Sequence, residues 1–139
     1  MSDWNNNVIE EFRANEGKVG GGFEGAPMTL LHHTGRKSGK QGIVPLMYQA
    51  GDDADTFYIF ASAAGAPAHP AWYFNVTDAG EATVELGSET FPVKVTEVTG
   101  SERDRIYAEQ IRRYPGFGEY EEKTAGIRTI PVLQLKRAA

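Results

Sequence analysis

Six short segments of this chain alternate apolar with polar residues or are rich in branched and aromatic side chains, and only a few residues separate most of them. These patterns predict β-strands at 28–33, 43–50, 56–62, 82–86, 90–98 and 129–135. Gly87-Ser88 suits the two-residue turn of a hairpin. A parallel sheet needs a long crossover after every strand, and most of these gaps are too short for one. The spacing therefore predicts a small antiparallel barrel.

Other segments have the periodicity of helices. Apolar residues predict a short helix over 4–15, and Ser101 with Asp104 resembles a capping box that opens a longer helix over 101–113. Residues 69–76 predict one or two helical turns, 116–123 a loop or short helix, and 17–25 a glycine-rich connector. With 139 residues, we expect a single domain. The expected class is mainly β (α+β), with about six strands, an N-terminal helix and one longer late helix.

Charge and cysteine content exclude several classes of protein. A net charge of −5 does not supply the basic face that general nucleic-acid binding needs. The chain has no cysteine, which excludes disulfides and thiolate catalysis and fits a reducing cytoplasm, and its first residues do not resemble a signal peptide. Glycine and proline interrupt the longest uncharged run, 56–77, so we expect no membrane span. The three histidines have no recognised ligand spacing, so we expect no metal site.

One cationic run marks a candidate binding site. Thr34-Gly35-Arg36-Lys37-Ser38-Gly39-Lys40 lies in a stretch without any carboxylate between Glu24 and Asp52. Glycines let a ligand approach the backbone, and N–H groups, hydroxyls and cations can converge on phosphate or carboxylate oxygens. The run is not a Walker A loop, because it is one residue short and Gln41 replaces the required Ser or Thr. On these residues alone, an anion socket and a plain hairpin turn are both open.

Three other segments are candidates for ligand contact. Ser62-Ala63-Ala64-Gly65 follows a predicted strand and suits either a flat ring lying against the main chain or a tight turn. Trp72 and Asn75 belong to an aromatic helix that packs inward or reaches a ligand beside Ser62. Tyr114, Phe117 and Tyr120 are spaced three residues apart. Their phenols could donate protons near a redox ring, or the three side chains could simply cap the barrel.

Taken together, these segments resemble the deazaflavin-dependent nitroreductase family, whose members use coenzyme F-420. The resemblance spans residues 8 to 135. It is carried, in family order, by Gly17 to Gly21, Thr34 to Gly39 with Pro45-Leu46, Ala61-Ser62, Pro67 with His69 to Asn75, Tyr114-Pro115 with Tyr120, and Thr129 to Val132. It implies a split β-barrel that binds the deazaflavin in a groove, and it favours the anion socket over the plain turn.

The resemblance also implies roles for individual residues. Cations opposite the coenzyme's phosphate and oligoglutamate tail would be Arg36, Lys37 and Lys40, and added hydrogen bonds would come from Ser38, Gly39 and Gln41. The ring would be lined by Pro45, Met47, Ala61 and Ser62, with Trp72 and Asn75 behind it. The residues that would polarise the acceptor or supply a proton are Ser62, Tyr114 and Tyr120.

The chain departs from the family pattern at two informative positions. Gly42 stands where many relatives carry arginine, which predicts weaker binding of the coenzyme's anionic tail. Phe117 replaces a phenol that some nitroimidazole-reducing relatives have. The first hypothesis is an oxidoreductase that passes hydride from reduced F-420 to a small acceptor, either a quinone, an enone or a nitro compound. The alternatives are a split-barrel oxidoreductase that uses FMN and a non-catalytic carrier of F-420. We expect a monomer or a homodimer.

Overall fold

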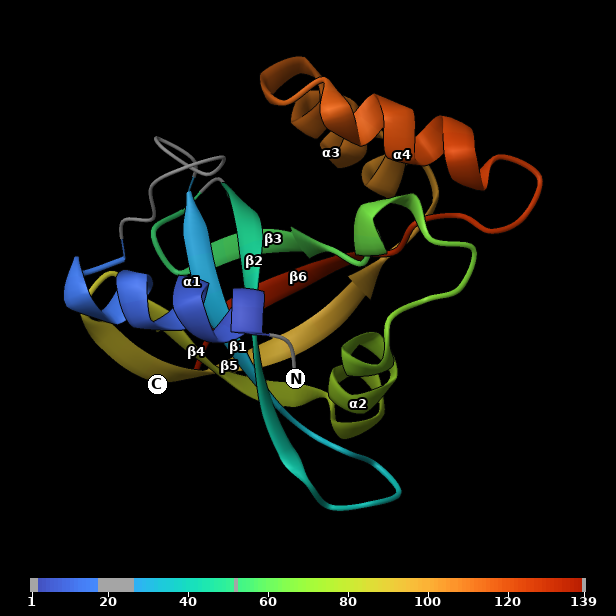
Figure 1. The fold of residues 1–139 in the computed structure, drawn as a ribbon. Coiled ribbons are helices and arrows are strands. Elements are labelled where there is room, and N and C mark those ends of the chain that lie inside the picture. Colours follow the sequence, from blue (N-terminus) through green and yellow to red (C-terminus); the bar gives the residue numbers. More distant parts are fainter. Residues whose placement is uncertain (1–2, 18–26, 52, 139) are drawn as a thin grey trace.

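The computed structural model describes residues 3–17, 27–51 and 53–138, and a β-barrel stands at its centre (Figure 1). Six antiparallel strands close in the order β1-β2-β3-β6-β5-β4. Their bounds are β1 Met28–Thr34, β2 Gln41–Ala50, β3 Thr56–Phe60, β4 Glu81–Leu86, β5 Glu89–Val98 and β6 Val132–Arg137. Side chains that alternate along these strands fill the interior, and Leu31, Ile59 and Leu133 are fully buried there. The predicted antiparallel barrel is confirmed.

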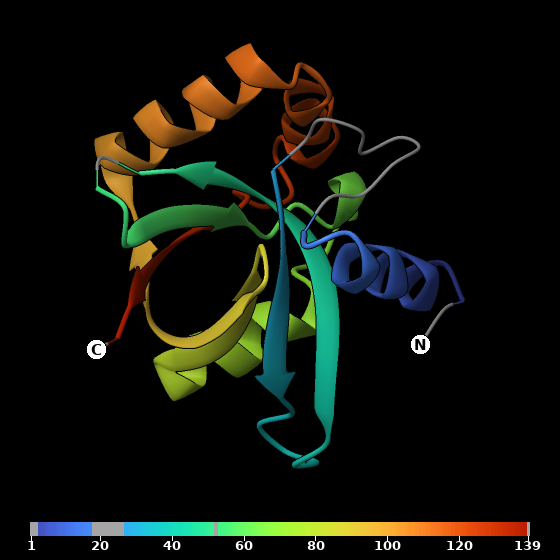
Figure 2. The same cartoon turned by 90° about the vertical axis from the view of Figure 1, so that its left-hand side faces the viewer.

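Helices surround the barrel, and their bounds are α1 Asp3–Ala14, α2 Ala71–Ala79, α3 Gly100–Arg113 and α4 Gly116–Thr124. Phe12 of α1 packs on outward-facing residues of β1 and β2. Trp72 and Val76 of α2 join the apolar cluster inside the barrel. Figures 1 and 2 both show α2 on one side of the barrel and the α3–α4 pair on the other. The predicted N-terminal helix and longer late helix are both present, and residues 116–123 are helical.

Strand β2 changes partner towards its C-terminal end, so each part of it has a strand neighbour on one side only. Residues 41–47 pair with β1, whereas residues 48–50 pair with β3. Pro45 lies in the first part, opposite Leu30 of β1. Proline has no N–H, so it is tolerated where a strand has a neighbour on one side only. The sequence alone places Pro45 at an edge, a strand entry or a bulge, and the register shows the first of these.

The last strand begins later than predicted because its first residues are held by other groups. Strand β6 starts at Val132 rather than at residue 129. The carbonyl oxygen of Ile130 accepts hydrogen bonds from Nε and Nη2 of Arg103, at 3.1 and 2.9 Å. Pro131 has no N–H, and its carbonyl accepts the Ala61 N–H at 3.0 Å. These three contacts anchor the chain before the ladder begins.

The predicted capping box is wrong. Helix α3 begins at Gly100, and its N-cap residue, Thr99, makes no side-chain cap hydrogen bond. The Asp104 carboxylate instead pairs with the Arg103 guanidinium at 3.1 Å. The predicted glycine-rich connector at 17–25 lies, apart from Gly17, outside the described residues.

Candidate functional site

The cationic run forms the loop that joins β1 to β2. The Gly35 N–H donates to the Lys40 carbonyl at 2.7 Å, and the Gly39 N–H donates to the Gly35 carbonyl at 2.9 Å. The Lys40 N–H donates to the Ser38 hydroxyl at 3.2 Å. Gly39 has a φ of +72°, which a residue with a side chain rarely adopts. The loop is therefore closed by its own hydrogen bonds, and the N–H groups of Gly39 and Lys40, which the sequence offered to an anion, are already used.

Three cations project from this loop, and none of them has a carboxylate partner among the residues that the structure describes. Arg36, Lys37 and Lys40 are exposed, and the ion pairs found among the described residues all involve other side chains. The Arg36 guanidinium lies 5.3 Å from the centre of the Phe74 ring on α2. An uncompensated positive cluster in an acidic protein attracts anions. Because the N–H groups of Gly35, Arg36, Gly39 and Lys40 are used, we expect an anion at this loop to be bound mainly by the cationic side chains.

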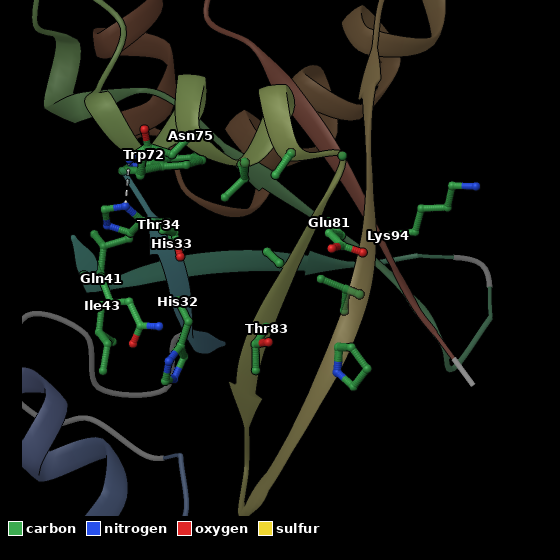
Figure 3. A pocket seen from close by; sticks show the side chains of 18 of the residues that line it. His32, His33, Thr34, Gln41, Ile43, Trp72, Asn75, Glu81, Thr83 and Lys94 are labelled. Carbon is green, nitrogen blue, oxygen red and sulfur yellow. Dashed lines mark hydrogen bonds between the residues drawn. The ribbon is translucent and has the colours of Figure 1, made fainter. Parts of the chain in front are cut away.

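Asn75 fastens the loop to α2. Its Oδ1 accepts the Arg36 N–H at 3.1 Å, and its Nδ2 donates to Nδ1 of His33 at 3.0 Å (Figure 3). Since Nδ1 of His33 accepts this bond, the imidazole proton lies on Nε2. Burial, and then the nearby His32, lowers the pKa of His33, which favours the same neutral form. The family resemblance placed Asn75 behind the ring; in the structure its amide oxygen bonds the loop at Arg36 and its amide nitrogen bonds His33 of β1.

His33 also explains the glycine at position 42. A Cβ atom on Gly42 would lie 2.9 Å from Nε2 of His33, closer than side chains tolerate. The strand register places the two residues opposite each other. The imidazole therefore occupies the space in which a side chain at position 42 would begin.

A pocket of about 1370 Å³ runs along α2 beside the loop. Three of the predicted cofactor residues line it, namely Gln41, Trp72 and Asn75 (Figure 3). Trp72 is only 7% exposed and packs into the barrel core. The predicted catalytic residues Ser62, Tyr114 and Tyr120 are absent from its lining. The pocket and these residues are therefore separate regions.

Two of the four predicted ring-lining residues, Pro45 and Met47, lie on the other face of β2. Val44 and Leu46 pack against the barrel core, so Pro45 and Met47, one residue away from each, face outwards. Met47 packs against the aromatic cluster beneath α3 and α4, and partly buried Tyr114 and Tyr120 pack against the same cluster. The structure thus brings Met47 together with both predicted catalytic tyrosines.

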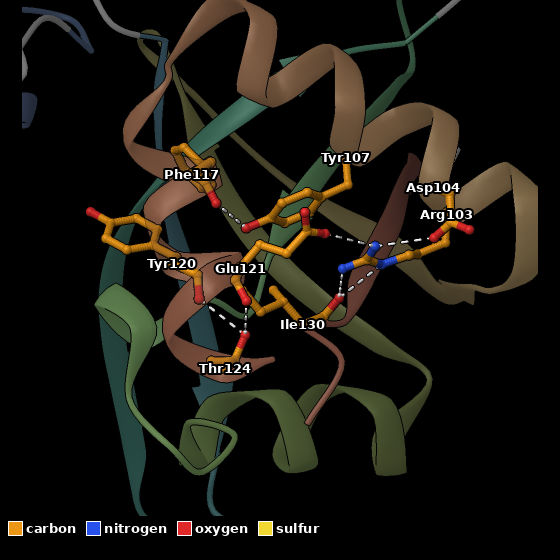
Figure 4. Close-up of polar contacts among 8 residues, drawn as sticks. All are labelled: Arg103, Asp104, Tyr107, Phe117, Tyr120, Glu121, Thr124 and Ile130. Carbon is orange, nitrogen blue, oxygen red and sulfur yellow. Dashed lines mark hydrogen bonds and ion pairs between the residues drawn. The ribbon is translucent and has the colours of Figure 1, made fainter. Parts of the chain in front are cut away.

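Phe117 anchors this aromatic cluster. Its ring lies 5.3 Å from that of Tyr120 and 5.6 Å from that of Phe60, both nearly edge-on. Its carbonyl accepts the Tyr107 hydroxyl at 2.7 Å (Figure 4). Burial raises the pKa of Tyr107 to about 12, so this phenol stays neutral. In Figure 4 the Tyr120 phenol points away from these contacts.

Ser62 lies on a turn that packs against α4. The turn contains the 3-10 helix η2, Ala63–Gly65, and a Cβ on Gly65 would come within 2.8 Å of the Lys123 side chain and 3.5 Å of the Tyr120 Cα. The Ser62, Tyr114 and Tyr120 hydroxyls have no hydrogen-bond partner within the described part of the chain. Ala61 differs from them, because it is fully buried and both its N–H and its carbonyl are bonded. We expect it to shape the wall rather than touch a ligand.

Arg128 is a site residue that sequence reasoning missed. Its guanidinium donates to the carbonyl oxygens of Ala61, Ser62 and Ala66, at 3.0, 2.8 and 3.0 Å. It also lies 2.9 Å from Nδ1 of His69. Arg128 follows α4, and no motif or spacing in the sequence connects it with the Ser62 turn. Only the folded chain brings them together.

Two absences apply to the residues that the structure describes. None of their helices combines the length and the apolar character that crossing a membrane requires. No group of three or more histidine or carboxylate side chains among them could hold a metal ion.

The barrel and the side chains on its surface suit one kind of ligand. The barrel carries a cationic hairpin at one end of the half-paired strand β2. Near the other end lies an outward-facing wall with Tyr114 and Tyr120, whose hydroxyls have no partner among the described residues. This arrangement suits a planar cofactor with an anionic tail.

The chain belongs to the F420H(2)-dependent quinone reductase family, whose model matches residues 4–136. A relative from Mycobacterium tuberculosis, named provisionally as F420H(2)-dependent quinone reductase Rv3178, is 32% identical over 120 residues, covering 86% of this chain and 98% of that protein. A solved F420-H2 dependent reductase, FDR-A, matches with a TM-score of 0.68 and 36% identity, covering 79% of this chain and 94% of its own. A structure described as a domain-swapped dimer matches with a TM-score of 0.70 and 33% identity, covering 94% and 93%.

Family membership confirms three of the sequence-based predictions, namely the resemblance to deazaflavin-dependent reductases, the enzyme class and the cofactor. The protein is an F420-dependent oxidoreductase. The roles assigned to individual residues, and the range of acceptors, stay predictions.

Proposed function

We propose that this protein transfers hydride from reduced coenzyme F420 to a quinone, and that the cationic hairpin holds the coenzyme's anionic part. The observation that carries the proposal is the group of three exposed cations without carboxylate partners among the described residues, on a barrel of this family. A phosphate and a chain of glutamates are the anions that such a cluster would neutralise. When bound, the coenzyme supplies a hydride from its ring.

The protein's own residues would bind the coenzyme's tail, orient its ring towards the acceptor and shield both from water. Arg36, Lys37 and Lys40 would contact the anionic tail through their side chains. Pro45 and Met47, on the outer face of β2, would support the ring together with the Ser62 turn. Holding the ring and the acceptor in one orientation is the main catalytic contribution expected of such a site.

A reduced quinone also needs a proton and stabilisation of its developing negative charge. The Ser62, Tyr114 and Tyr120 hydroxyls are the candidates, because they have no partner among the described residues. Both tyrosines pack against the aromatic cluster, and the Ser62 turn packs against α4 beside Tyr120. Tyr107 is a poor candidate, since its hydroxyl is already bonded to the Phe117 carbonyl. We favour Tyr120 as the acceptor's partner, because its α4 backbone packs against the turn that carries Ser62.

Enones and nitro compounds remain in the proposed acceptor range. Phe117 makes fast reduction of nitro compounds less expected, because its ring is buried in the aromatic cluster and offers no hydroxyl to a nitro group. We therefore expect quinones to be reduced faster than nitroimidazoles.

The test is oxidation of reduced F420, followed by its visible absorbance, with a panel of quinones, enones and nitro compounds. Turnover that is fastest with quinones supports the proposal. Binding of F420 without turnover by any acceptor would favour the carrier alternative. Tight FMN binding with no F420 binding, measured by fluorescence titration, would favour the FMN alternative. A monomer or homodimer is still expected, and sizing of the purified protein in solution checks it.

A further inference from the structure

One guanidinium organises the turn that carries Ser62. Arg128 uses Nε for the Ala66 carbonyl, Nη2 for the Ser62 carbonyl, and Nη1 for both the Ala61 carbonyl and the His69 imidazole. Four of its five N–H donors are therefore engaged within a single stretch of nine residues. These contacts reach 59 to 67 residues back along the chain.

We propose that Arg128 is a positioning residue, whose guanidinium fixes the 61–66 turn so that the Ser62 hydroxyl and the adjoining face of α4 are presented to the bound ring and its acceptor. This inference deepens the proposed function and rests on it, because that function places the ring against the turn. Arg128 itself is not expected to touch the coenzyme, since its donors are directed at the main chain.

The turn needs such a clamp because its conformation is strained. Ala63 has a φ of +47°, in the left-handed region that residues with a side chain avoid. Two local bonds stabilise it, from the Gly65 N–H to the Ser62 carbonyl and from the Ala66 N–H to the Ala63 carbonyl. The Ser62 carbonyl points towards Arg128, and the Ser62 hydroxyl has no partner in the described part of the chain. A planar fork of donors suits several fixed carbonyls at once, whereas the ammonium of lysine could reach fewer of them.

The titration of His69 can show whether Arg128 holds the turn, and it can be measured without a cofactor. Its Nδ1 accepts from Arg128, so the imidazole proton lies on Nε2. The pKa of His69 is lowered, first by burial and then by the positive charge of Arg128, while Glu97 raises it. The other groups that face the imidazole are the rings of Tyr73 and Phe74, with centres 4.9 and 5.9 Å away. The Tyr73 hydroxyl donates to Glu97 at 2.6 Å and stays neutral.

The experiment compares Arg128→Lys with Arg128→Gln. Lysine keeps the positive charge of Arg128 but lacks the planar set of donors of the guanidinium group, and glutamine lacks both. The matched control is Arg112→Gln on α3, because Arg112 is exposed and its one ion pair among the described residues is with Glu109. Each protein is measured for its unfolding midpoint, its F420 dissociation constant, its kcat with a quinone, and the titration of His69 by NMR without coenzyme.

We expect kcat to fall about 10- to 100-fold in both Arg128 variants, because small displacements of positioning groups cost this much. The F420 dissociation constant should stay within about threefold, since the hairpin cations are untouched. The pKa of His69 should rise most in Arg128→Gln. Arg112→Gln should change none of these quantities. Adding Ala63→Gly to Arg128→Lys should recover part of kcat, because glycine adopts the positive φ without strain.

Several results would overturn the inference. An unchanged kcat in folded Arg128→Lys would show that the charge suffices and that the fork does not position the turn. An unmoved His69 titration in Arg128→Gln would show that the two groups are not in contact. If neither variant folds, amide exchange in the wild type decides: fast exchange at Gly65 and Ala66 would contradict a clamped turn. If the wild type oxidises no reduced F420, the proposed function fails and the catalytic role with it, whereas the titration still decides whether Arg128 holds the turn.

Discussion

Removing two charges from the cationic hairpin should weaken coenzyme binding by a predictable amount. Arg36→Gln with Lys37→Gln leaves the loop intact, because the loop is closed by main-chain bonds and by Asn75. Both side chains are exposed, so water screens their contacts with an anion. Two opposite unit charges about 4 Å apart are then worth about 1 kcal/mol. Losing two such contacts costs about 2 kcal/mol, or about a 30-fold rise in the dissociation constant.

Fluorescence titration of F420 at several salt concentrations measures this effect. At low salt the wild type should bind about 30 times more tightly than the variant. The difference should shrink towards 1 M salt, where the screening length is about 3 Å. Arg112→Gln with Arg113→Gln is the matched control, since it removes the same charge from exposed sites on α3.

The result that refutes the reasoning is equal coenzyme affinity in the hairpin variant and the wild type at low salt. An equal loss in the α3 control would also refute it, because the effect would then come from net charge rather than from the hairpin. A 30-fold loss that persists unchanged at 1 M salt would show that the contacts are buried and not the exposed ones described above.

Three further predictions concern stability. Gly42→Ala should lower the unfolding midpoint in thermal melts, because the new Cβ would press on the His33 ring that Asn75 holds in place; an unchanged midpoint would show that this ring moves freely. Tyr107→Phe should cost about 1–2 kcal/mol in urea unfolding, because a buried carbonyl of α4 loses its donor. Hydrogen bonds from Arg13, above all, hold the pKa of Glu85 below its ordinary value of 4.5. The stability that this carboxylate contributes is therefore present above about pH 4.5 and is lost as the pH falls through its folded pKa. Arg13→Gln should remove that part of the acid sensitivity, and identical urea midpoints against pH in both proteins would contradict it.

Arg103 on α3 and Arg128 after α4 fix the main chain in the same way. Arg103 holds the Ile130 carbonyl just before β6, and Arg128 holds the turn just after β3. Each guanidinium donates to main-chain carbonyl oxygens next to an end of a strand. Buried carbonyls without a partner are costly, so a guanidinium at these points stabilises an irregular backbone that also has to form a site.

The sequence alone determined the local features of this protein. Alternating side chains specified the strands, Pro45 marked the half-paired part of β2, and the 34–40 run specified an uncompensated cationic hairpin. These features were readable because each depends on residues close together in the chain, whose periodicity and turn chemistry act locally. The family resemblance added the cofactor and the enzyme class, both of which the comparisons confirm.

The tertiary structure decided which groups meet. It brought Asn75 of α2 to the hairpin at Arg36 and to His33 of β1, and it brought Arg128 to the Ser62 turn. These contacts join residues about 40 to 67 positions apart, so they depend on strand register and helix placement and not on any short pattern. Barrel closure fixes where the hairpin, the Ser62 turn and α4 lie, because the strands that carry or flank them pair only in the folded chain.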